Sequence, residues 1–275
     1  LVSWDVQGPP STHPSRLADV RPGDSIRLRL KWRALADAPN YWTFVHLHDT
    51  TGRLAAQADD RPDYGYAPTP LWQRGDEVLD DYVVRIPKDA PAGRYTLSVG
   101  WYTRPELRNL PVTTGSATAD RVVLGVVKVQ PMQVPSEDIP GFRPVGVTFG
   151  GRAHLRGVVV EPVESSSTPR TLRVTLLWQA VGGPWPDATV FVHLVDGAEN
   201  LVAQHDGPPM NGGFPLSIWS DGEVIVDPHE IVLPEGVPLD SLELRIGLYD
   251  GPSGTRYLRE DGSDSVILRP IGRAQ

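Results

Sequence analysis

The chain repeats itself over most of its length. The sequence Phe-Val-His-Leu at 44–47 recurs at 191–194, a spacing of 147 residues, which is the difference between positions 191 and 44. The same spacing relates Leu-x-Ala-Gln-x-Asp at 54–59 to its copy at 201–206. A repeat of this length exceeds the roughly 20–50 residues of a solenoid unit and matches a whole domain of about 100–150 residues. We therefore predict a tandem of two related domains.

Composition bounds what two such domains could do. The chain has 275 residues, enough for two hydrophobic cores, and no cysteine, which excludes disulfides, thiolate nucleophiles and cysteine-ligated zinc. The formal net charge of −8 opposes binding to a phosphate backbone, so we expect no nucleic-acid partner. No apolar run reaches the roughly 18–20 residues that cross a bilayer, and no signal peptide is visible. Because the first residue is Leu1, we expect a fragment of a larger protein.

The hydrophobic pattern predicts strands throughout. Ile26, Leu28, Leu30 and Trp32 alternate with basic residues, and 172–179 repeats that pattern in the second copy. A period of two indicates a strand with one buried and one solvated face. Short strands separated by proline and glycine turns, without a convincing helix, predict an all-β fold of two tandem immunoglobulin-like β-sandwich domains. We place the first domain at 1–130, a proline-rich linker at 131–148 and the second domain at 149–275.

Two histidines raise the question of a metal site. His46 and His48 lie two residues apart on one predicted strand face, and a His-x-His pair with Asp49 or Asp59 would offer metal-ligand chemistry. The second copy keeps His193 but has Val195 in place of the second histidine. We favour the simpler interpretation, in which the shared histidine is hydrogen-bonded to a nearby aspartate on the sheet surface. No metal site is predicted.

Adjacent aspartates offer a second chemical candidate, as Asp59-Asp60 and Asp80-Asp81. Glycosidases place two carboxylates about 5–10 Å apart across one bond, whereas neighbours on a strand point to opposite faces. We match Asp59 with Asp206, and Asp81 with Asp227, in the second copy. Turn and capping hydrogen bonds are the expected use of these carboxylates, and we predict no catalytic residue.

The segment 60–72 is the most suggestive of binding, because long loops on a rigid sandwich often carry ligand sites. Tyr64, Tyr66 and Trp72 offer flat amphipathic rings that could stack on a sugar, with Asp59 and Arg61 as polar partners. The second copy matches Trp72 with Trp219 but lacks both tyrosines. A shared residue is more often structural, so a role for Trp72 at the end of the core stays open.

The motifs form an ordered set. Phe-Val-His-Leu, Leu-x-Ala-Gln-x-Asp, Trp-x-x-Gly and Gly-x-Tyr follow one another over 44–59, 72–75 and 93–102, and over 191–206, 219–222 and 247–249. The set resembles a β-sandwich domain of large bacterial membrane glycosyltransferases of the mannosyltransferase type, especially from Chloroflexi-type thermophiles. The second copy departs near its last motif, with Asp-Ser-Leu at 240–242 where the first copy has Ala-Gly-Arg at 92–94. The resemblance implies a soluble, non-cytoplasmic module that follows a multi-spanning transferase region, and it assigns no catalytic residue.

We therefore expect a non-catalytic accessory module on the extracytoplasmic face of a bacterial membrane or at the cell surface, with carbohydrate binding as its leading function. The expected partners are a polysaccharide or glycan and the transmembrane domain of the same polypeptide, and no cofactor is predicted. The alternative is a purely structural spacer or protein-interaction domain, in which Trp72 and both loop tyrosines would be buried. A metal-dependent or glycosidase-like enzyme is the third interpretation.

Overall fold

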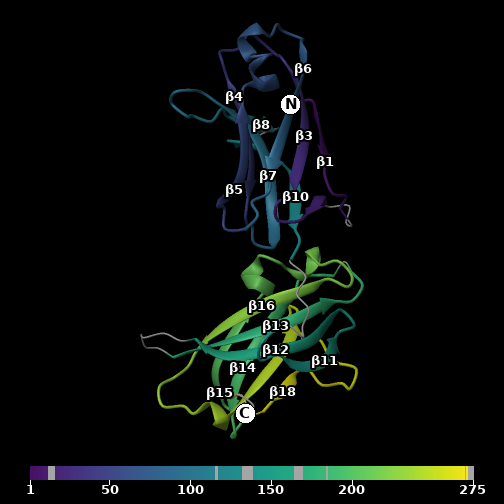
Figure 1. The fold of residues 1–275 in the computed structure, drawn as a ribbon, viewed down its shortest axis with the longest axis vertical. Coiled ribbons are helices and arrows are strands. Elements are labelled where there is room, and N and C mark those ends of the chain that lie inside the picture. The colour runs from purple at the N-terminus through teal and green to yellow at the C-terminus, as the bar shows by residue number, and fades with distance from the viewer. Residues whose placement is uncertain are drawn as a thin grey trace. The chain divides into compact units, whose positions relative to one another are not determined.

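The computed structural model describes residues 1–11, 16–114, 117–131, 139–163, 170–183, 185–269 and 271. The chain forms two compact units, Leu1–Gln130 and Pro131–Gln275, each built mainly from two β-sheets (Figure 1). In the described residues the helical segments are short 3-10 turns, and none of them is a helix of the length and apolar character that a membrane span needs. The predicted fold class, two immunoglobulin-like β-sandwiches, is confirmed.

In the first unit a three-stranded sheet of order β1-β3-β6 packs on a five-stranded sheet of order β2-β10-β7-β4-β5. Strand β2 runs parallel to β10, and the other neighbours are antiparallel. A small hairpin, β8-β9, follows β7. The elements are β1 (Ser3–Gln7), β2 (Arg16–Val20), β3 (Ser25–Arg33), β4 (Trp42–His48), β5 (Leu54–Asp60), η1 (Pro62–Gly65), η2 (Thr69–Leu71), β6 (Glu77–Arg85), β7 (Gly93–Tyr102), β8 (Val112–Thr114), β9 (Ala117–Ala119) and β10 (Val122–Val129).

The second unit has a related plan, with two four-stranded sheets of order β11-β12-β13-β16 and β15-β14-β17-β18. Its elements are β11 (Arg143–Phe149), β12 (Ala153–Val163), β13 (Thr171–Ala180), β14 (Thr189–Asp196), β15 (Leu201–Gly207), η4 (Pro209–Gly212), η5 (Leu216–Ile218), β16 (Val224–Val232), η6 (Leu239–Ser241), β17 (Leu242–Tyr249) and β18 (Val266–Leu268). Strands β4, β5, β6 and β7 of the first unit therefore correspond to β14, β15, β16 and β17.

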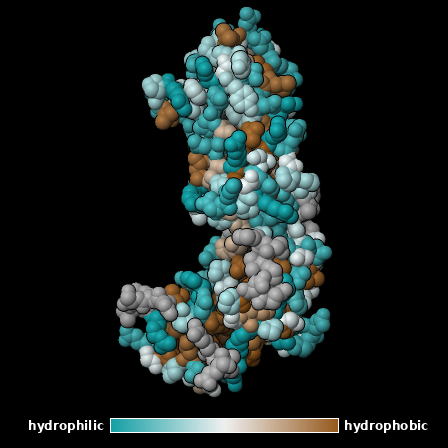
Figure 2. All heavy atoms as spheres, in the orientation of Figure 1, coloured by the Kyte–Doolittle hydropathy of each residue, from teal (hydrophilic) through white to brown (hydrophobic). Residues whose placement is uncertain are grey.

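The cores follow from the alternation in the sequence. In β3 the side chains of Ile26, Leu28 and Leu30 are buried between the sheets, while Arg27 and Arg29 are exposed. Each turned-in aliphatic side chain contributes roughly 1.5–3 kcal/mol when fully removed from water. The outer surface is correspondingly polar, and Figure 2 shows hydrophilic residues over much of the visible face, with hydrophobic residues scattered between them.

The segment 131–148 was predicted to be a linker, but its C-terminal part forms a strand. Arg143–Phe149 forms the edge strand β11, paired antiparallel with β12. The proline at position 144 led to the prediction of a linker, but proline is tolerated in an edge strand. The pairing register of β11 with β12 shifts between Pro144 and Val147. Opposite this break stands Gly157, where an added Cβ would lie 2.4 Å from the carbonyl oxygen of Arg143. Residues 132–138 of the predicted linker lie outside the described residues.

Candidate functional site

The loop between β5 and β6 of the first unit has a strained backbone. Asp63 and Tyr64 adopt positive φ angles of 51° and 53°, in the left-handed region that non-glycine residues rarely occupy. The second unit has the same turn at Met210 and Asn211, with φ angles of 51° and 52°. Two consecutive residues in this region cost of order 1–3 kcal/mol each, so the surrounding structure must hold them in place.

A buried carboxylate holds the turn. Asp80 of β6 is 1% exposed, and its Oδ1 accepts a hydrogen bond from the backbone N–H of Asp63 at 2.9 Å. Its Oδ2 accepts from the indole N–H of Trp32, the hydroxyl of Tyr82 and the hydroxyl of Thr43. Burial raises the pKa of Asp80, and the four hydrogen bonds oppose that shift.

The second unit has an equivalent buried aspartate, and its position corrects the match between aspartates of the two copies. Asp227 is buried, accepts the indole N–H of Trp178 and accepts the backbone N–H of Met210 at 2.7 Å. Its counterpart is therefore Asp80 and not Asp81, which the sequence had suggested. Asp81 faces solvent and forms an exposed ion pair with Arg29. The two neighbours do point to opposite faces, as the strand geometry predicted.

The predicted sugar-binding residues separate into two groups. Tyr64 and Tyr66 are exposed, at 56% and 84%, on the anchored loop. Trp72 is only 5% exposed, and its indole N–H donates to the carbonyl of Ala67 at 2.8 Å. Trp219 is equally buried and makes the equivalent bond to Phe214. Trp72 thus packs in the core and does not share an exposed platform with the tyrosines.

Arg61 lies between the loop and the sheet. Its guanidinium carbon is 5.8 Å from the ring centroid of Trp42, the first residue of β4, while that of Arg104 lies 4.0 Å from the same centroid. Arg104 also donates to the hydroxyl of Tyr102 at 3.1 Å. On the other side, the Arg61 side chain rests against Gly65, where an added Cβ would lie 2.9 Å from Nη2. Two cations therefore share one aromatic ring beside the tyrosine loop.

Asp59 contacts a histidine of the same sheet. Its Oδ1 lies 3.4 Å from Nε2 of His46, and in the second unit the corresponding atoms of Asp206 and His193 are 2.9 Å apart. The predicted hydrogen bond between the shared histidine and an aspartate is confirmed for His193, whereas His46 and Asp59 lie in contact without a hydrogen bond. His48 turns its Nε2 toward the guanidinium of Arg121 at 3.4 Å, a cation that disfavours a metal at that nitrogen. Among the described residues no group of three or more histidine and acidic side chains is placed to hold a metal ion.

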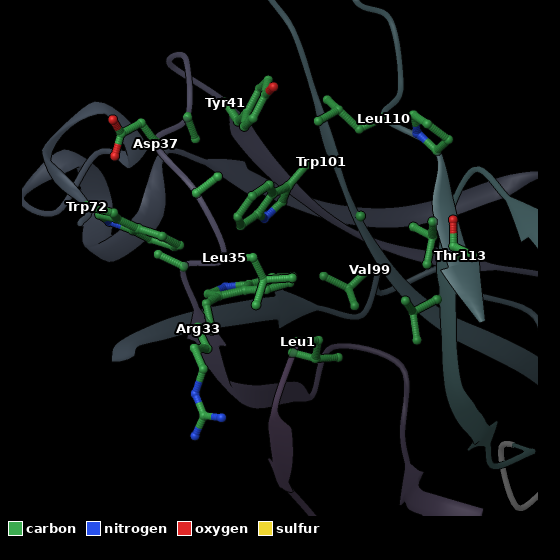
Figure 3. Close-up of a pocket in the computed structure, with 18 residues that line it drawn as sticks. Leu1, Arg33, Leu35, Asp37, Tyr41, Trp72, Val99, Trp101, Leu110 and Thr113 are labelled. Atoms are coloured by element: carbon green, nitrogen blue, oxygen red, sulfur yellow. The ribbon is translucent and has the colours of Figure 1, made fainter. Parts of the chain in front are cut away.

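The first unit also contains an aromatic pocket of about 510 Å³. In Figure 3 the rings of Trp72, Trp101 and Tyr41 lie on one side of it, and Leu110 and Thr113 lie on the other. Trp101 stacks between its neighbours, with centroids 4.7 Å from Trp32, 5.7 Å from Tyr41 and 5.6 Å from Trp72. Its indole N–H is buried and has no hydrogen-bond partner within the described part of the chain. The lining is mainly apolar, which suits an apolar group better than a highly hydrated one.

Sequence reasoning did not identify Trp42, Arg104, Trp101 or Tyr41. A signal was present, because the second copy replaces them with Thr189, Gly251, Leu248 and Ala188, respectively. Because the second unit forms the same fold without these residues, the shared fold does not require them. These residues come together through loop packing; for example, the hydroxyl of Thr69 accepts a hydrogen bond from the backbone N–H of Tyr41. Such packing cannot be predicted from the spacing of residues in the sequence.

No family model and no curated protein matches the chain. Among solved structures, a glycosyl hydrolase family 2 member from Bacteroides cellulosilyticus is similar at 12% identity and a TM-score of 0.27, over 86% of this chain and 26% of that chain. A beta-glucuronidase from Bacteroides uniformis is similar at 11% identity and a TM-score of 0.28, over 96% of this chain and 31% of that chain. The chain thus spans about a quarter to a third of the length of these proteins. A likeness of this degree carries no information about ligand or activity.

Proposed function

We propose that the chain is a non-catalytic accessory module of a larger extracytoplasmic membrane or cell-surface protein, and that its first unit binds carbohydrate through the loop that carries Tyr64 and Tyr66. The observation that carries the proposal is the exposure of two tyrosine rings on a loop whose backbone is fixed by Asp80. An exposed aromatic pair on a fixed loop is a feature that a fold does not need for its own stability.

The physical basis is a rigid stacking surface. A tyrosine ring presents an apolar face to the C–H groups of a sugar and a hydroxyl to its polar edge. Because the hydrogen bond from the Asp63 N–H to Asp80 already restricts the loop, ligand binding loses less conformational entropy than it would on a mobile loop. Two carboxylates near the loop lie against groups of the fold: Asp80 is buried in the anchor, and Asp59 faces His46. This supports a binding role over a catalytic one.

The second unit supports the assignment to the first. It keeps the strained turn and the buried Asp227 but has Asn211 and Gly213 where the first unit has Tyr64 and Tyr66. The anchored turn is therefore common framework, and the aromatic tips are an addition specific to the first unit. We assign the second unit a supporting role.

The test is a glycan array with the intact chain, followed by titration of each hit against Tyr64→Ala combined with Tyr66→Ala. We expect the double variant to lose about tenfold or more in affinity, because the substitutions remove the apolar contact area of two rings and a tenfold loss corresponds to only about 1.4 kcal/mol. Leu201→Ala, at an exposed position of the second unit, is the matched control and should leave binding unchanged. A blank array with a folded protein would overturn the proposal in favour of a spacer or protein-interaction role, and unchanged affinity in the double variant would overturn the site.

A further inference from the structure

The two guanidinium groups on Trp42 have no obvious role in the fold. Neither Arg61 nor Arg104 forms an ion pair with a carboxylate in the described residues, and the Nε of Arg61 is buried without a hydrogen-bond partner there. Arginines elsewhere on the same unit do face carboxylates, as Arg29 does with Asp81. An unpaired guanidinium near an aromatic ring keeps its full positive charge, because the ring supplies only a quadrupole.

The second unit shows that the cluster is dispensable for the fold. Trp42 pairs with Tyr102 across the sheet, and Thr189 pairs with Tyr249 in the corresponding register. At the positions of Arg61 and Arg104 the second unit has Pro208 and Gly251. The sheet, the anchored turn and the tyrosine at the end of the strand all form without the tryptophan and the two arginines.

The chemistry of the cluster favours an anion. A guanidinium that lies over a ring presents N–H groups at its edge. Nη2 of Arg104 donates to the hydroxyl of Tyr102, and the remaining N–H groups of the two arginines can donate to a carboxylate. Both arginines lie near the ring of Trp42, at 5.8 Å and 4.0 Å from its centroid, so the positive charge is concentrated around one residue. Among the acidic residues of this region, Asp59 lies 3.4 Å from His46, and Oδ1 of Asp60 accepts the backbone N–H of Arg61 at 2.7 Å. Asp63 is exposed on the loop, and its charge limits the affinity.

We infer that the carbohydrate bound by the first unit is acidic, with a uronic-acid carboxylate held by Arg61 and Arg104 and the sugar ring placed against Tyr64 and Tyr66. The contact of Arg61 with Gly65 joins the two halves of this site. The inference rests on the proposed function, and it adds the class of ligand. Because the chain carries a net charge of −8, the attraction must come from this local pair rather than from the field of the whole protein.

The test compares trisaccharides of glucuronic, galacturonic and mannuronic acid with their methyl esters, which keep the ring but lose the charge. We expect at least one acid to bind the intact chain tenfold or more tightly than its ester. Arg61→Gln and Arg104→Gln should each reduce the affinity for the acid more than the affinity for the ester, so that the ratio of the two affinities falls toward one. Arg74→Gln, at an exposed arginine on the same connection between β5 and β6, is the matched control and should have no effect.

The outcomes separate this inference from the proposed function. Equal binding of acid and ester, lost with Tyr64→Ala and Tyr66→Ala, would keep the carbohydrate site and overturn the acidic ligand. Binding of neither member of any pair by the folded chain, together with a blank glycan array, would overturn both. A sulfated trisaccharide that binds as tightly as the best acid would overturn the recognition of a carboxylate, because both cations would then respond to charge alone.

Discussion

The carboxylate of Asp80 accepts hydrogen bonds from donors on β3, β4, β6 and the loop after β5. One side chain therefore ties both sheets to the strained turn that carries Tyr64. Burying a carboxylate costs free energy because its charge is desolvated, and these four hydrogen bonds offset that cost. Loss of one partner leaves a buried donor or acceptor unsatisfied, which destabilises the fold. Asp227 has the same position in the second unit, so the arrangement belongs to the fold rather than to the ligand site.

Asp80→Asn tests this role. The amide has one oxygen, so its NH₂ group must face either the N–H of Asp63 or the three donors on the other side, and the mismatch should cost about 2 kcal/mol. We expect a lower urea midpoint for the first unit with the slope unchanged. Asp81→Asn removes only an exposed ion pair with Arg29 and should change stability by less than about 1 kcal/mol. Equal effects of the two variants would show that Asp80 is not the anchor.

The indole groups around the pocket give a second residue-scale prediction. Trp101→Phe keeps an aromatic ring in the stack and removes a buried N–H that has no partner in the described residues, so it should change stability by less than about 1 kcal/mol. Trp72→Phe leaves the carbonyl of Ala67 without its donor and should cost about 1–2 kcal/mol more. Denaturant unfolding of both variants measures the difference. A loss at Trp101 as large as that at Trp72 would indicate that its N–H is paired.

At the scale of the strand, the repeated motifs reflect one packing arrangement. Phe44 of β4 stands opposite Gly100 of β7, and Phe191 of β14 stands opposite Gly247 of β17. In each unit an added Cβ on the glycine would lie 2.4 Å from the Cζ of the phenylalanine. The ring covers the glycine on the face of the sheet turned away from the core, which explains why Phe-x-His and Gly-x-Tyr occur together in both copies.

Gly247→Ala should therefore destabilise the second unit by about 1–3 kcal/mol, because the methyl group meets both the Phe191 ring and the carbonyl of Asp264. Gly197→Ala is the control, at a glycine with open space around its Cα and no positive φ, and it should stay within about 0.5 kcal/mol of the parent. Thermal unfolding of the two variants provides the comparison. Matching stabilities would mean that the ring moves aside at little cost.

Element positions were largely predictable from the sequence, and contacts between elements were not. The alternation in β3 and β13 gave strands with the correct inward faces, since burial on one side of a sheet imposes that period. The strand β11 was missed because its proline favours a linker, and only its pairing with β12 shows that it lies at a tolerant edge. The exposed tyrosines were identified from their place on a long loop, whereas the Trp42 cluster required the approach of three separate segments.

For the whole molecule, duplication provides an internal comparison between two chains of one fold. Features shared by the units, such as the buried aspartate and the glycine under a phenylalanine ring, are requirements of the sandwich. Features found in one unit are candidates for function or for a local difference in stability. The sequence repeat revealed the duplication, but the shared buried aspartate was matched to the wrong neighbour, because a difference of one residue in spacing cannot be resolved without the strand register.

The units also differ in where a titrating histidine is partly buried. His48 of the first unit corresponds to Val195, and His205 of the second corresponds to Ala58. Burial is the largest cause that lowers the pKa of both histidines, and a nearby cation or a second histidine adds to it. The groups that face them are Arg121, His46, Asp49 and Asp120 for His48, and His229, Asp227, Asp206 and Glu230 for His205.

The sign of the pH dependence follows from these lowered pKa values. Above the ordinary histidine pKa of about 6.5, both folded and unfolded states are neutral and the groups impose no penalty. As the pH falls through that value, the unfolded chain gains protons that the folded chain resists, so stability is lost. Replacing each histidine with its counterpart, as His48→Val and His205→Ala, should reduce the loss of Tm between about pH 7.5 and about pH 5.5. Leu201→Ala should keep the pH dependence of the parent, and the same slope in both histidine variants would show that other groups control it.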